Sequence, residues 1–285
     1  MQIFDKRDAL QDALNQVRSS NQRIGLVPTM GNLHEGHLAL VDAAKKQSDF
    51  VLATIFVNPL QFGSDEDLDN YPRTLEADYE KLASRGCNGV FVPAVSEMYP
   101  TGLDNQTLIS VPGLSEKHCG KSRPSHFDGV CTVVNKLFNL TMPDLAFFGE
   151  KDFQQLQIIR KMAADFCMPI NITGVPIVRQ ESGLAMSSRN NYLDDKQLLI
   201  APGLYQCLKN ISSQIQEGNR DFSALEITAT IMLEDAGLKP DYFHICQIDT
   251  LEAAKATDND LVILAAAWLG PTRLIDNFKI ALNAK

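Results

Sequence analysis

The first part of the chain alternates short apolar runs with segments of helical periodicity. Three runs lack alternating polar positions, as is typical of strands covered on both faces: IGLVPT from Ile24, FVLATIFV from Phe50 to Val57, and GVFVP from Gly89. Apolar residues recur at helical spacing in Leu38–Lys46 and Leu75–Arg85, and Gly86 follows the second. This order predicts a parallel sheet with right-handed crossovers, which is a doubly wound α/β architecture.

The alternation continues to about residue 178 and then changes. Helices are predicted near Val130–Leu140 and along a stripe of Phe153, Leu156, Ile159, Met162, Ala163 and Phe166, with strands at LAFFG and INITGVPIV. Helical stretches at Gln197–Gln216 and Phe222–Ala236 then precede DYFHICQI, DLVILAAAW and RLIDNF, which are typical of a small antiparallel sheet. We expect a boundary near Val178, with a Rossmann-like domain over residues 1–177 and a smaller α+β domain over residues 178–285.

Composition narrows the possible partners. The 285 residues include 35 acidic side chains against 26 lysines and arginines, and the net charge of −9 disfavours nucleic acid as the main ligand. The six cysteines form no CxxC pair, so we expect reduced core thiols. No leader pattern and no apolar run of about 18 residues occurs, so we expect a cytoplasmic protein without a membrane partner. Trp268 is expected to pack in the core at a strand end.

Two histidines follow the first predicted strand. His34 and His37 lie one turn apart at the start of a helix, and Gly31 allows close backbone approach. Free N–H groups and the positive end of the helix dipole favour a phosphate there, and imidazoles can donate to its oxygens. Alternatively, His34 caps the helix and His37 is an ordinary half-buried histidine. Zinc is disfavoured because the other histidines and cysteines offer no close paired spacing for further ligands.

Asn58 and Gln61 follow the next strand. Their amides could present uncharged donors and acceptors to a hydroxylated or carboxylated small molecule. Alternatively, Asn58 and Pro59 form a turn, which accounts for the same residues without a ligand.

Further polar groups follow a later strand and the proposed boundary. Lys151, in the bridge from Gly149 to Asp152, can meet phosphate, Asp152 can cap the next helix, and Gln155 lies one turn further on. The segment GLAMSSRNNYL adds two hydroxyls and the guanidinium of Arg189, which suits phosphate oxygens. Each segment also fits a solvated helix start or cap. A loop with Lys121, Arg123 and His126 fits either a solvated turn or a mobile lid.

Ligands of open α/β sheets bind outside the carboxyl ends of the strands, where these groups fall. Two histidines, a lysine, an arginine and serines after strands of one sheet predict a triphosphate site.

Five motifs together resemble one enzyme family. VPTMGNLHEGH, IFVNPLQF, YPRT, FGEKDFQQL and MSSRNNYL have the order and approximate separations found in the pantoate:β-alanine ligases, or pantothenate synthetases, and the likeness extends to AAWLGPTRLIDN. A bare HxGH occurs throughout the wider nucleotidyltransferase superfamily. MSSR lacks the two lysines of the KMSKS loop of the tRNA synthetases in that superfamily, so Lys151 and Arg189 would share its role.

The resemblance implies ATP-dependent condensation of (R)-pantoate with β-alanine to pantothenate, AMP and pyrophosphate, through pantoyl adenylate, in pantothenate and coenzyme A biosynthesis. It also implies Mg²⁺ bound through the ATP phosphates, a homodimer, an ATP- and pantoate-binding first domain, and a second domain that covers the active site. His37 would be the proton donor, acting with His34, Lys151 and Arg189, and Gln61 and Gln155 would hold pantoate and β-alanine. The implied ATP-binding residues are Met30, Gly31, Asn32, Leu33, His34, Glu35, Gly36, His37, Gly149, Glu150, Lys151, Asp152, Val178, Met186, Ser187, Ser188 and Arg189.

Two other functions fit part of the pattern. A nucleotidyltransferase with a dinucleotide-type product would keep the nucleotide in its product and use a phosphorylated cosubstrate, whereas Gln61 and Gln155 suit a ligand with hydroxyl and carboxylate groups better. A catalytically silent nucleotide-binding module would bind ATP without pantoate-dependent pyrophosphate release. The full set of polar residues argues against such a module.

Overall fold

The computed structural model describes residues 1–63, 68–69 and 71–282, which form two compact units. Unit 1 contains Met1–Glu150 and Gln155–Pro176, and unit 2 contains Lys151–Gln154 and Ile177–Lys285. The division of function between residues 1–177 and 178–285 stays a prediction.

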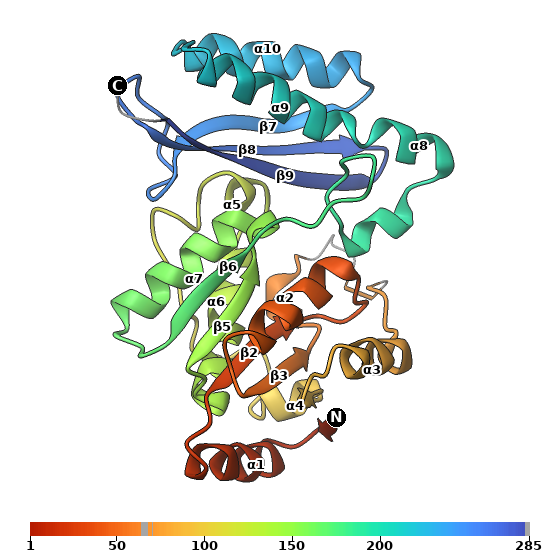
Figure 1. The fold of residues 1–285 in the computed structure, drawn as a ribbon, viewed down its shortest axis with the longest axis vertical. Helices are drawn as coiled ribbons and strands as arrows, with labels where there is room; N and C mark the ends of the chain where they lie inside the picture. Colours follow the sequence, from red (N-terminus) through yellow and green to blue (C-terminus); the bar gives the residue numbers. More distant parts are fainter. Residues whose placement is uncertain (64–67, 70, 283–285) are drawn as a thin grey trace. The chain divides into compact units, whose positions relative to one another are not determined.

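Unit 1 is built on a six-stranded parallel sheet (Figure 1). Its strands are β1 (Gln2–Phe4), β2 (Ile24–Thr29), β3 (Phe50–Ile55), β4 (Gly89–Phe91), β5 (Leu145–Gly149) and β6 (Asn171–Val175). Their order is β1-β4-β3-β2-β5-β6, which confirms the doubly wound, Rossmann-like prediction. The edge strand β1 was not expected, because three residues are too few to show a pattern.

The described helices that connect these strands include the four that were predicted, close to their predicted positions, and three that were not predicted, over residues 7–19, 95–98 and 119–122. They are α1 (Arg7–Ser19), α2 (Glu35–Lys45), α3 (Leu75–Ser84), α4 (Val95–Met98), α5 (Cys119–Ser122), α6 (His126–Thr141) and α7 (Phe153–Asp165), with short 3₁₀ turns η1 (Pro59–Gln61) and η2 (Glu150–Asp152). Helix α2 begins three residues before the predicted Leu38, because His34 caps it. Phe166 was predicted to join the apolar stripe of α7, but it follows the helix end and is 58% exposed.

The core of unit 1 explains why the central strands are continuously apolar. Ile24, Leu26 and Val27 of β2 are fully buried, as are Val51 and Leu52 of β3. A parallel strand covered on both faces has no position for a solvated side chain. Strands β2 and β5 are neighbours, and the sheet continues to β3 on one side and to β6 on the other. The loops after Thr29 and Gly149 therefore start at adjacent carboxyl ends, where ligands of such sheets bind.

Unit 2 is a three-stranded antiparallel sheet with two helices packed on it (Figure 1). Its elements are η3 (Ser188–Tyr192), α8 (Asp195–Ile200), α9 (Gly203–Gln216), α10 (Phe222–Asp235), β7 (Lys239–Gln247), β8 (Asp260–Leu269) and β9 (Thr272–Ala281). The helix predicted over Gln197–Gln216 is two helices, because Pro202 begins the second as its N-cap. The core prediction for Trp268 is wrong: the side chain is 37% exposed, one residue before the end of β8.

The thiol prediction holds for most of the cysteines. Cys87, Cys131, Cys207 and Cys246 are buried, whereas Cys119 is half-buried and Cys167 is exposed. No helix within residues 1–63, 68–69 and 71–282 is both long and apolar enough to cross a membrane.

Candidate active site

The loop after β2 turns sharply before it reaches the two histidines. Gly31 and Asn32 adopt φ angles of 83° and 49°, in the left-handed region. A Cβ at Gly31 would lie 3.0 Å from Ile55 Cγ2, so both the angle and the space require glycine. The Gly31 N–H donates to Thr29 Oγ1 at 3.2 Å, and that hydroxyl donates to the Thr54 carbonyl at 2.7 Å. The turn is thereby anchored to the ends of β2 and β3.

His34 and His37 form a reciprocal capping box at the start of α2. The Gly36 N–H donates to His34 Nδ1 at 3.1 Å, and the His34 N–H donates to His37 Nδ1 at 3.3 Å. Since an Nδ1 that accepts a hydrogen bond carries no proton, each imidazole holds its proton on Nε2. The ring centroids lie 4.1 Å apart. The structure thus confirms the capping role of His34 and also leaves both rings with Nε2 as their donor.

The backbone N–H groups around the histidines have partners inside the protein. Those of Asn32 and Leu33 donate to the Asp78 carboxylate, that of Gly36 to His34 Nδ1, and that of His37 to the His34 carbonyl. The expectation that free N–H groups here receive a phosphate does not hold for these residues. The imidazole Nε2–H groups are the side-chain donors of this loop that suit an anion.

Gln61 lies in a buried amide network at η1. Tyr99 Oη donates to Asn58 Oδ1 at 2.7 Å, and Asn58 Nδ2 donates to Gln61 Oε1 at 3.2 Å and to the Gly129 carbonyl at 3.1 Å. Gln61 Nε2 lies 3.1 Å from Met30 Sδ. Asn58 is 1% exposed, and its bond to Gln61 Oε1 orients the Gln61 amide. Asn58 Oδ1 also accepts from the Leu60 N–H, which confirms the turn predicted at Asn58 and Pro59.

His126 supports the same element from α6. Its Nδ1 lies 2.8 Å from the Gln61 carbonyl, and its Nε2 lies 2.9 Å from Arg123 Nη1. Because arginine only donates, Nε2 accepts and Nδ1–H donates. A Cβ at Gly129 would lie 2.2 Å from the Leu60 carbonyl oxygen, so α6 approaches η1 as closely as a backbone can. His126 is buried and starts a helix, which contradicts a purely solvated turn at this position.

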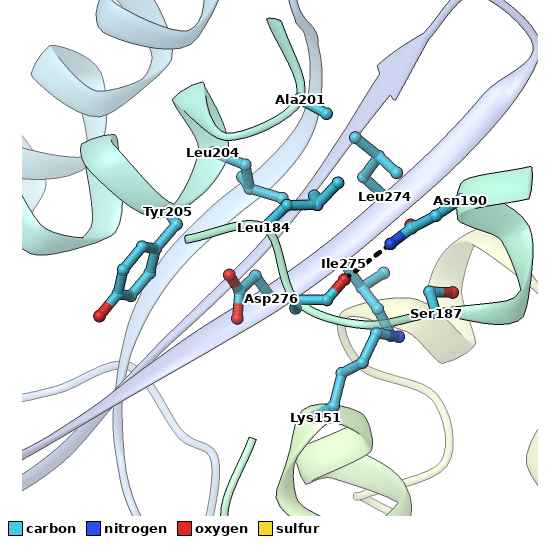
Figure 2. Close-up of a pocket in the computed structure, with 11 residues that line it drawn as sticks. Lys151, Leu184, Ser187, Asn190, Ala201, Leu204, Tyr205, Leu274, Ile275 and Asp276 are labelled. Atoms are coloured by element: carbon cyan, nitrogen blue, oxygen red, sulfur yellow. Dashed lines mark hydrogen bonds between the residues drawn. The ribbon is translucent and has the colours of Figure 1, made fainter. Parts of the chain in front are cut away.

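A pocket in unit 2 brings together residues from two of the sequence motifs. Lys151 and Ser187 line it beside Asn190, Tyr205 and Asp276, and Figure 2 shows the Lys151 side chain extending toward Ile275 of β9. Asn190 Nδ2 donates to the Ala185 carbonyl at 3.0 Å. Asn190 Oδ1 is buried and has no partner among the described residues. The pocket therefore offers a cation and a hydroxyl, and a buried acceptor of Asn190 lies on one of its lining residues.

A buried ion pair holds the strand-like segment that leads to Ser187. Arg179 donates to both Asp276 oxygens, at 2.6 and 2.9 Å, and its guanidinium lies 3.7 Å from the centroid of the Tyr205 ring. Burial raises the pKa of Asp276, and the Arg179 charge opposes that rise. Asn277 Nδ2 also donates to the Lys151 carbonyl at 3.0 Å. Strand β9 thereby fixes both Lys151 and the start of the 178–189 segment.

The remaining predicted residues fall in several settings. Met186 N–H donates to the Val178 carbonyl at 2.9 Å, and Arg189 N–H donates to Ser187 Oγ at 3.3 Å. Glu35 is exposed and pairs with Arg85 at 2.7 Å. Gln155 is half-buried on α7, and Asp152 is exposed directly before α7. The histidines and Gln61 belong to unit 1, and Lys151 and Ser187–Arg189 belong to unit 2.

Comparison with known proteins identifies the family. A family model described as pantoate-beta-alanine ligase matches residues 2–279. The chain belongs to the pantoate-β-alanine ligase family. The pantothenate synthetase of Pseudomonas putida is 56% identical over 276 residues, which are 97% of this chain and 96% of that protein.

Two solved structures of this ligase family share the fold. Pantothenate synthetase from Thermus thermophilus matches with a TM-score of 0.92 and 40% identity, covering 98% of this chain and 99% of that one. The pantoate-β-alanine ligase of Francisella tularensis, complexed with β-γ ATP and β-alanine, matches with a TM-score of 0.82 and 36% identity over 98% and 97% of the two chains. The resemblance of the five motifs is therefore confirmed, and neither alternative function gains support from these relatives.

Sequence reasoning missed several residues that contact the predicted site residues or line the unit 2 pocket. Asp78, Tyr99, Asn190 and Asp276 were not singled out, although Asn190 belongs to the quoted MSSRNNYL motif. Asp78, Tyr99 and Asp276 each make a buried contact with a residue distant in the sequence, and Asn190 has a buried oxygen without a partner among the described residues. No local sequence pattern reveals either feature.

Proposed function

We propose that this pantoate-β-alanine ligase, which condenses pantoate with β-alanine using ATP, works through a pantoyl-adenylate intermediate and releases pyrophosphate and AMP. Family membership supports the overall reaction. The observation that carries the proposed site is the capping box of His34 and His37, which places the proton of each of two adjacent rings on Nε2.

In the proposed first step, a pantoate carboxylate oxygen attacks the α-phosphorus of ATP. The bond from the α-phosphorus to the oxygen that bridges to the β-phosphorus breaks, and pyrophosphate leaves. This displacement needs charge neutralisation and in-line positioning more than a strong base. His34 and His37 would donate hydrogen bonds from Nε2–H to phosphate oxygens, and His37 would stabilise the leaving pyrophosphate in this way while keeping its proton, because its Nδ1 accepts from the His34 N–H.

The unit 2 pocket is a second proposed binding site for groups of the nucleotide. Lys151 and Arg189 would neutralise phosphate charge, with Ser187 and Ser188 donating hydrogen bonds. Asn190 Oδ1, which is buried without a partner among the described residues, would accept from a hydroxyl or amine of the nucleoside. Gly149 fits close approach of a ligand to the backbone, because a Cβ there would meet nothing within 4 Å.

Gln61 is the proposed anchor for pantoate, together with Gln155. Asn58 accepts from Tyr99 and donates to Gln61 Oε1, so the Gln61 amide is held in one orientation with Nε2–H as its donor. A fixed amide donor suits a hydroxyl or carboxylate oxygen of pantoate. Because η1 is locked by Gly129 and His126, this donor would be placed before substrate arrives.

In the proposed second step, the neutral amine of β-alanine attacks the acyl carbon of pantoyl adenylate. The bond from that carbon to the AMP oxygen breaks, AMP leaves, and the amine loses a proton to solvent or to released AMP. No side chain is assigned as the base.

Magnesium, a homodimer and a cytoplasmic location complete the proposal. Within the described part of the chain, no group of three or more His, Cys, Asp and Glu side chains could hold a metal ion. The donors of the site, imidazole and ammonium, suit phosphate oxygens rather than Mg²⁺. Mg²⁺ would therefore enter bound to ATP, where it supplies charge neutralisation. The homodimer follows from the family resemblance, and light scattering after size exclusion tests it.

A pyrophosphate-release assay with and without pantoate tests the function. Pyrophosphate should appear only when pantoate is present with ATP, and AMP and pantothenate should form when β-alanine is added. Formation of ADP, or pyrophosphate release that is independent of pantoate, would refute the proposal. Replacing pantoate by a phosphorylated acceptor is the matched control, and it should give no product.

A further inference from the structure

We propose that Asp78 is a positioning residue for the two histidines, and that α3 holds the loop from Gly31 to Leu33 in its active shape through Asp78 and Lys81. This inference rests on the proposed function, because it assumes that the histidines serve adenylation. It assigns to α3, which contains none of the predicted site residues, a role in that step.

The Asp78 carboxylate is bound from one side by the turn. Its Oδ1 accepts from the Leu33 N–H at 2.8 Å, and its Oδ2 accepts from the Asn32 N–H at 2.9 Å. Thr74 Oγ1 donates to the same Oδ2 at 3.2 Å. Asp78 is 0% exposed, so these three donors replace the water that the carboxylate gave up. These two charge-assisted bonds orient the two consecutive peptide units on either side of Asn32.

The turn that Asp78 holds contains an unfavourable backbone angle, and the hydrogen bonds to Asp78 offset its cost. Asn32 occupies the left-handed region, which is uncommon for a residue with a Cβ. His34 follows Leu33 directly and is the cap of α2, so the direction in which the chain enters α2 sets the position of both rings. A change in the peptide between Asn32 and Leu33 would therefore move the capping box.

Other residues of α3 contact the same region. Lys81 Nζ donates to the Leu33 carbonyl at 2.7 Å, so Leu33 is held at both its N–H and its C=O. Arg85 donates to Glu35 and to Asp42 of α2, each at 2.7 Å. Thr74, Asp78, Lys81 and Arg85 are spaced by four, three and four residues, which places them on one side of the helix. That side of α3 supports the loop from Gly31 to Leu33 and helix α2, and we call it the brace.

The charge of Asp78 is essential to this role because of hydrogen-bond direction. An ionised carboxylate has two acceptor oxygens and no donor. In Asp78→Asn, one oxygen becomes an NH₂ group that faces a backbone N–H, so either Asn32 or Leu33 loses its acceptor. The variant has almost the same volume, so packing of the helix changes little while the turn relaxes.

Half-reaction kinetics of Asp78→Asn test the inference. Pantoate-dependent pyrophosphate release should fall about 10²-fold, the size of effect that a misplacement of about 1 Å produces. Release of AMP from added pantoyl adenylate and β-alanine should stay within about 3-fold of the parent, because the second step does not use the histidines. A merely structural effect would reduce both half-reactions together. Glu80→Gln removes the same charge from an exposed position of α3 and should change neither.

Amide hydrogen exchange and histidine ¹⁵N spectra give a second readout that does not depend on activity. In folded Asp78→Asn, the amides of Asn32 and Leu33 should exchange faster, and the His37 Nδ1 signal should shift from the unprotonated toward the averaged position. Unchanged exchange and tautomer, or an unchanged adenylation rate, would overturn the inference. If Asp78→Asn fails to fold, Lys81→Met provides the test. It should slow adenylation about 10-fold and leave the rate of the second step unchanged. An adenylation rate equal to the parent's would overturn the inference that α3 holds the loop.

The two proposals fail in different ways. If His37→Ala abolishes pyrophosphate release and Asp78→Asn does not, the positioning role is wrong and the proposed function stands. If His37→Ala releases pyrophosphate normally, the role of the histidines in the proposed function is wrong.

Discussion

His34 and His37 each use Nδ1 to accept a backbone N–H of the same capping box, and their ring centroids lie 4.1 Å apart. The box therefore has two consequences: it begins α2, and it fixes the tautomer of both rings. Amide substitutions can separate these consequences, because asparagine places an acceptor near Nδ1 and glutamine places a donor near Nε2.

His37→Asn should fold with parental stability and lose adenylation. The asparagine oxygen can keep the bond to the His34 N–H, but no donor remains at the Nε2 position, so pyrophosphate release should fall about 10²- to 10³-fold. His37→Gln is the matched control and should retain more activity while losing about 1 kcal/mol of stability with the cap. Urea unfolding and single-turnover pyrophosphate release measure the two effects, and the reverse ranking of activities would contradict the assignment.

Breaking the pair of Arg179 and Asp276 should destabilise the protein strongly. The side chains are only 17% and 3% exposed, and removing one member of a buried pair costs about 3–5 kcal/mol because the other charge stays behind. Asp276→Asn should show this loss in urea unfolding and should also raise the Kd for ATP, since Arg179 supports the segment leading to Ser187. Asp165→Asn disrupts an exposed pair with Lys161 and should cost under about 1 kcal/mol. Equal losses in the two variants would refute this account of the burial effect.

Gly129→Ala should weaken pantoate binding. Its Cβ would lie 2.2 Å from the Leu60 carbonyl oxygen and 2.6 Å from the Gln61 nitrogen, so α6 and η1 must separate. Overpacking of this kind costs about 1–3 kcal/mol, and the displaced Gln61 should raise the KM for pantoate while the KM for ATP changes less. Gly149→Ala is the steric control, because it meets nothing within 4 Å and should unfold like the parent. Thermal unfolding and initial rates at varied pantoate decide the matter.

The cysteines should differ sharply in reactivity toward a thiol reagent. Burial raises the pKa of Cys131 and of Cys207 to about 12, so neither forms an appreciable thiolate at pH 8, whereas Cys167 is exposed. Titration of the native protein should show Cys167 as the fastest thiol, which Cys167→Ser removes, with half-buried Cys119 slower and the buried thiols reactive only after denaturation. Rapid modification of Cys207 in the native protein, detected by peptide mass spectrometry, would contradict this order.

Glu226 should make unit 2 less stable as the pH rises. Burial raises the pKa of Glu226, which accepts from the Ile245 N–H at 2.7 Å and so joins α10 to β7. Because the folded-state pKa lies above the unfolded value, this group contributes stability below about pH 4.5 that is lost as the pH rises through the folded pKa. Glu226→Gln keeps the acceptor and cannot ionise. Its unfolding free energy, relative to the parent, should therefore increase between pH 4 and pH 7, and a constant difference would refute the assignment.

The sequence by itself determined the ligase family and most of the alternation of strands and helices, but it missed β1, α1, α4 and α5 and the division of α8 from α9. Strand β2 was predictable because a run such as IGLVPT can be satisfied only where both faces are covered, and that requirement is local. The histidines, Lys151 and Ser187–Arg189 were found for a similar reason, since they follow strand ends or occupy ordered motifs. The same logic failed for Trp268, because the position of its strand end relative to the core is not a local property.

Only the tertiary structure decided how these residues are held. Asp78 is 45 residues from Leu33, Tyr99 is 41 from Asn58, and Arg179 is 97 from Asp276. On an amphipathic helix, Asp78 has the pattern of a surface residue, and it is buried only because the turn after β2 brings two N–H groups to it. Burial makes such a contact strong, and burial depends on packing between distant segments, which no local pattern encodes.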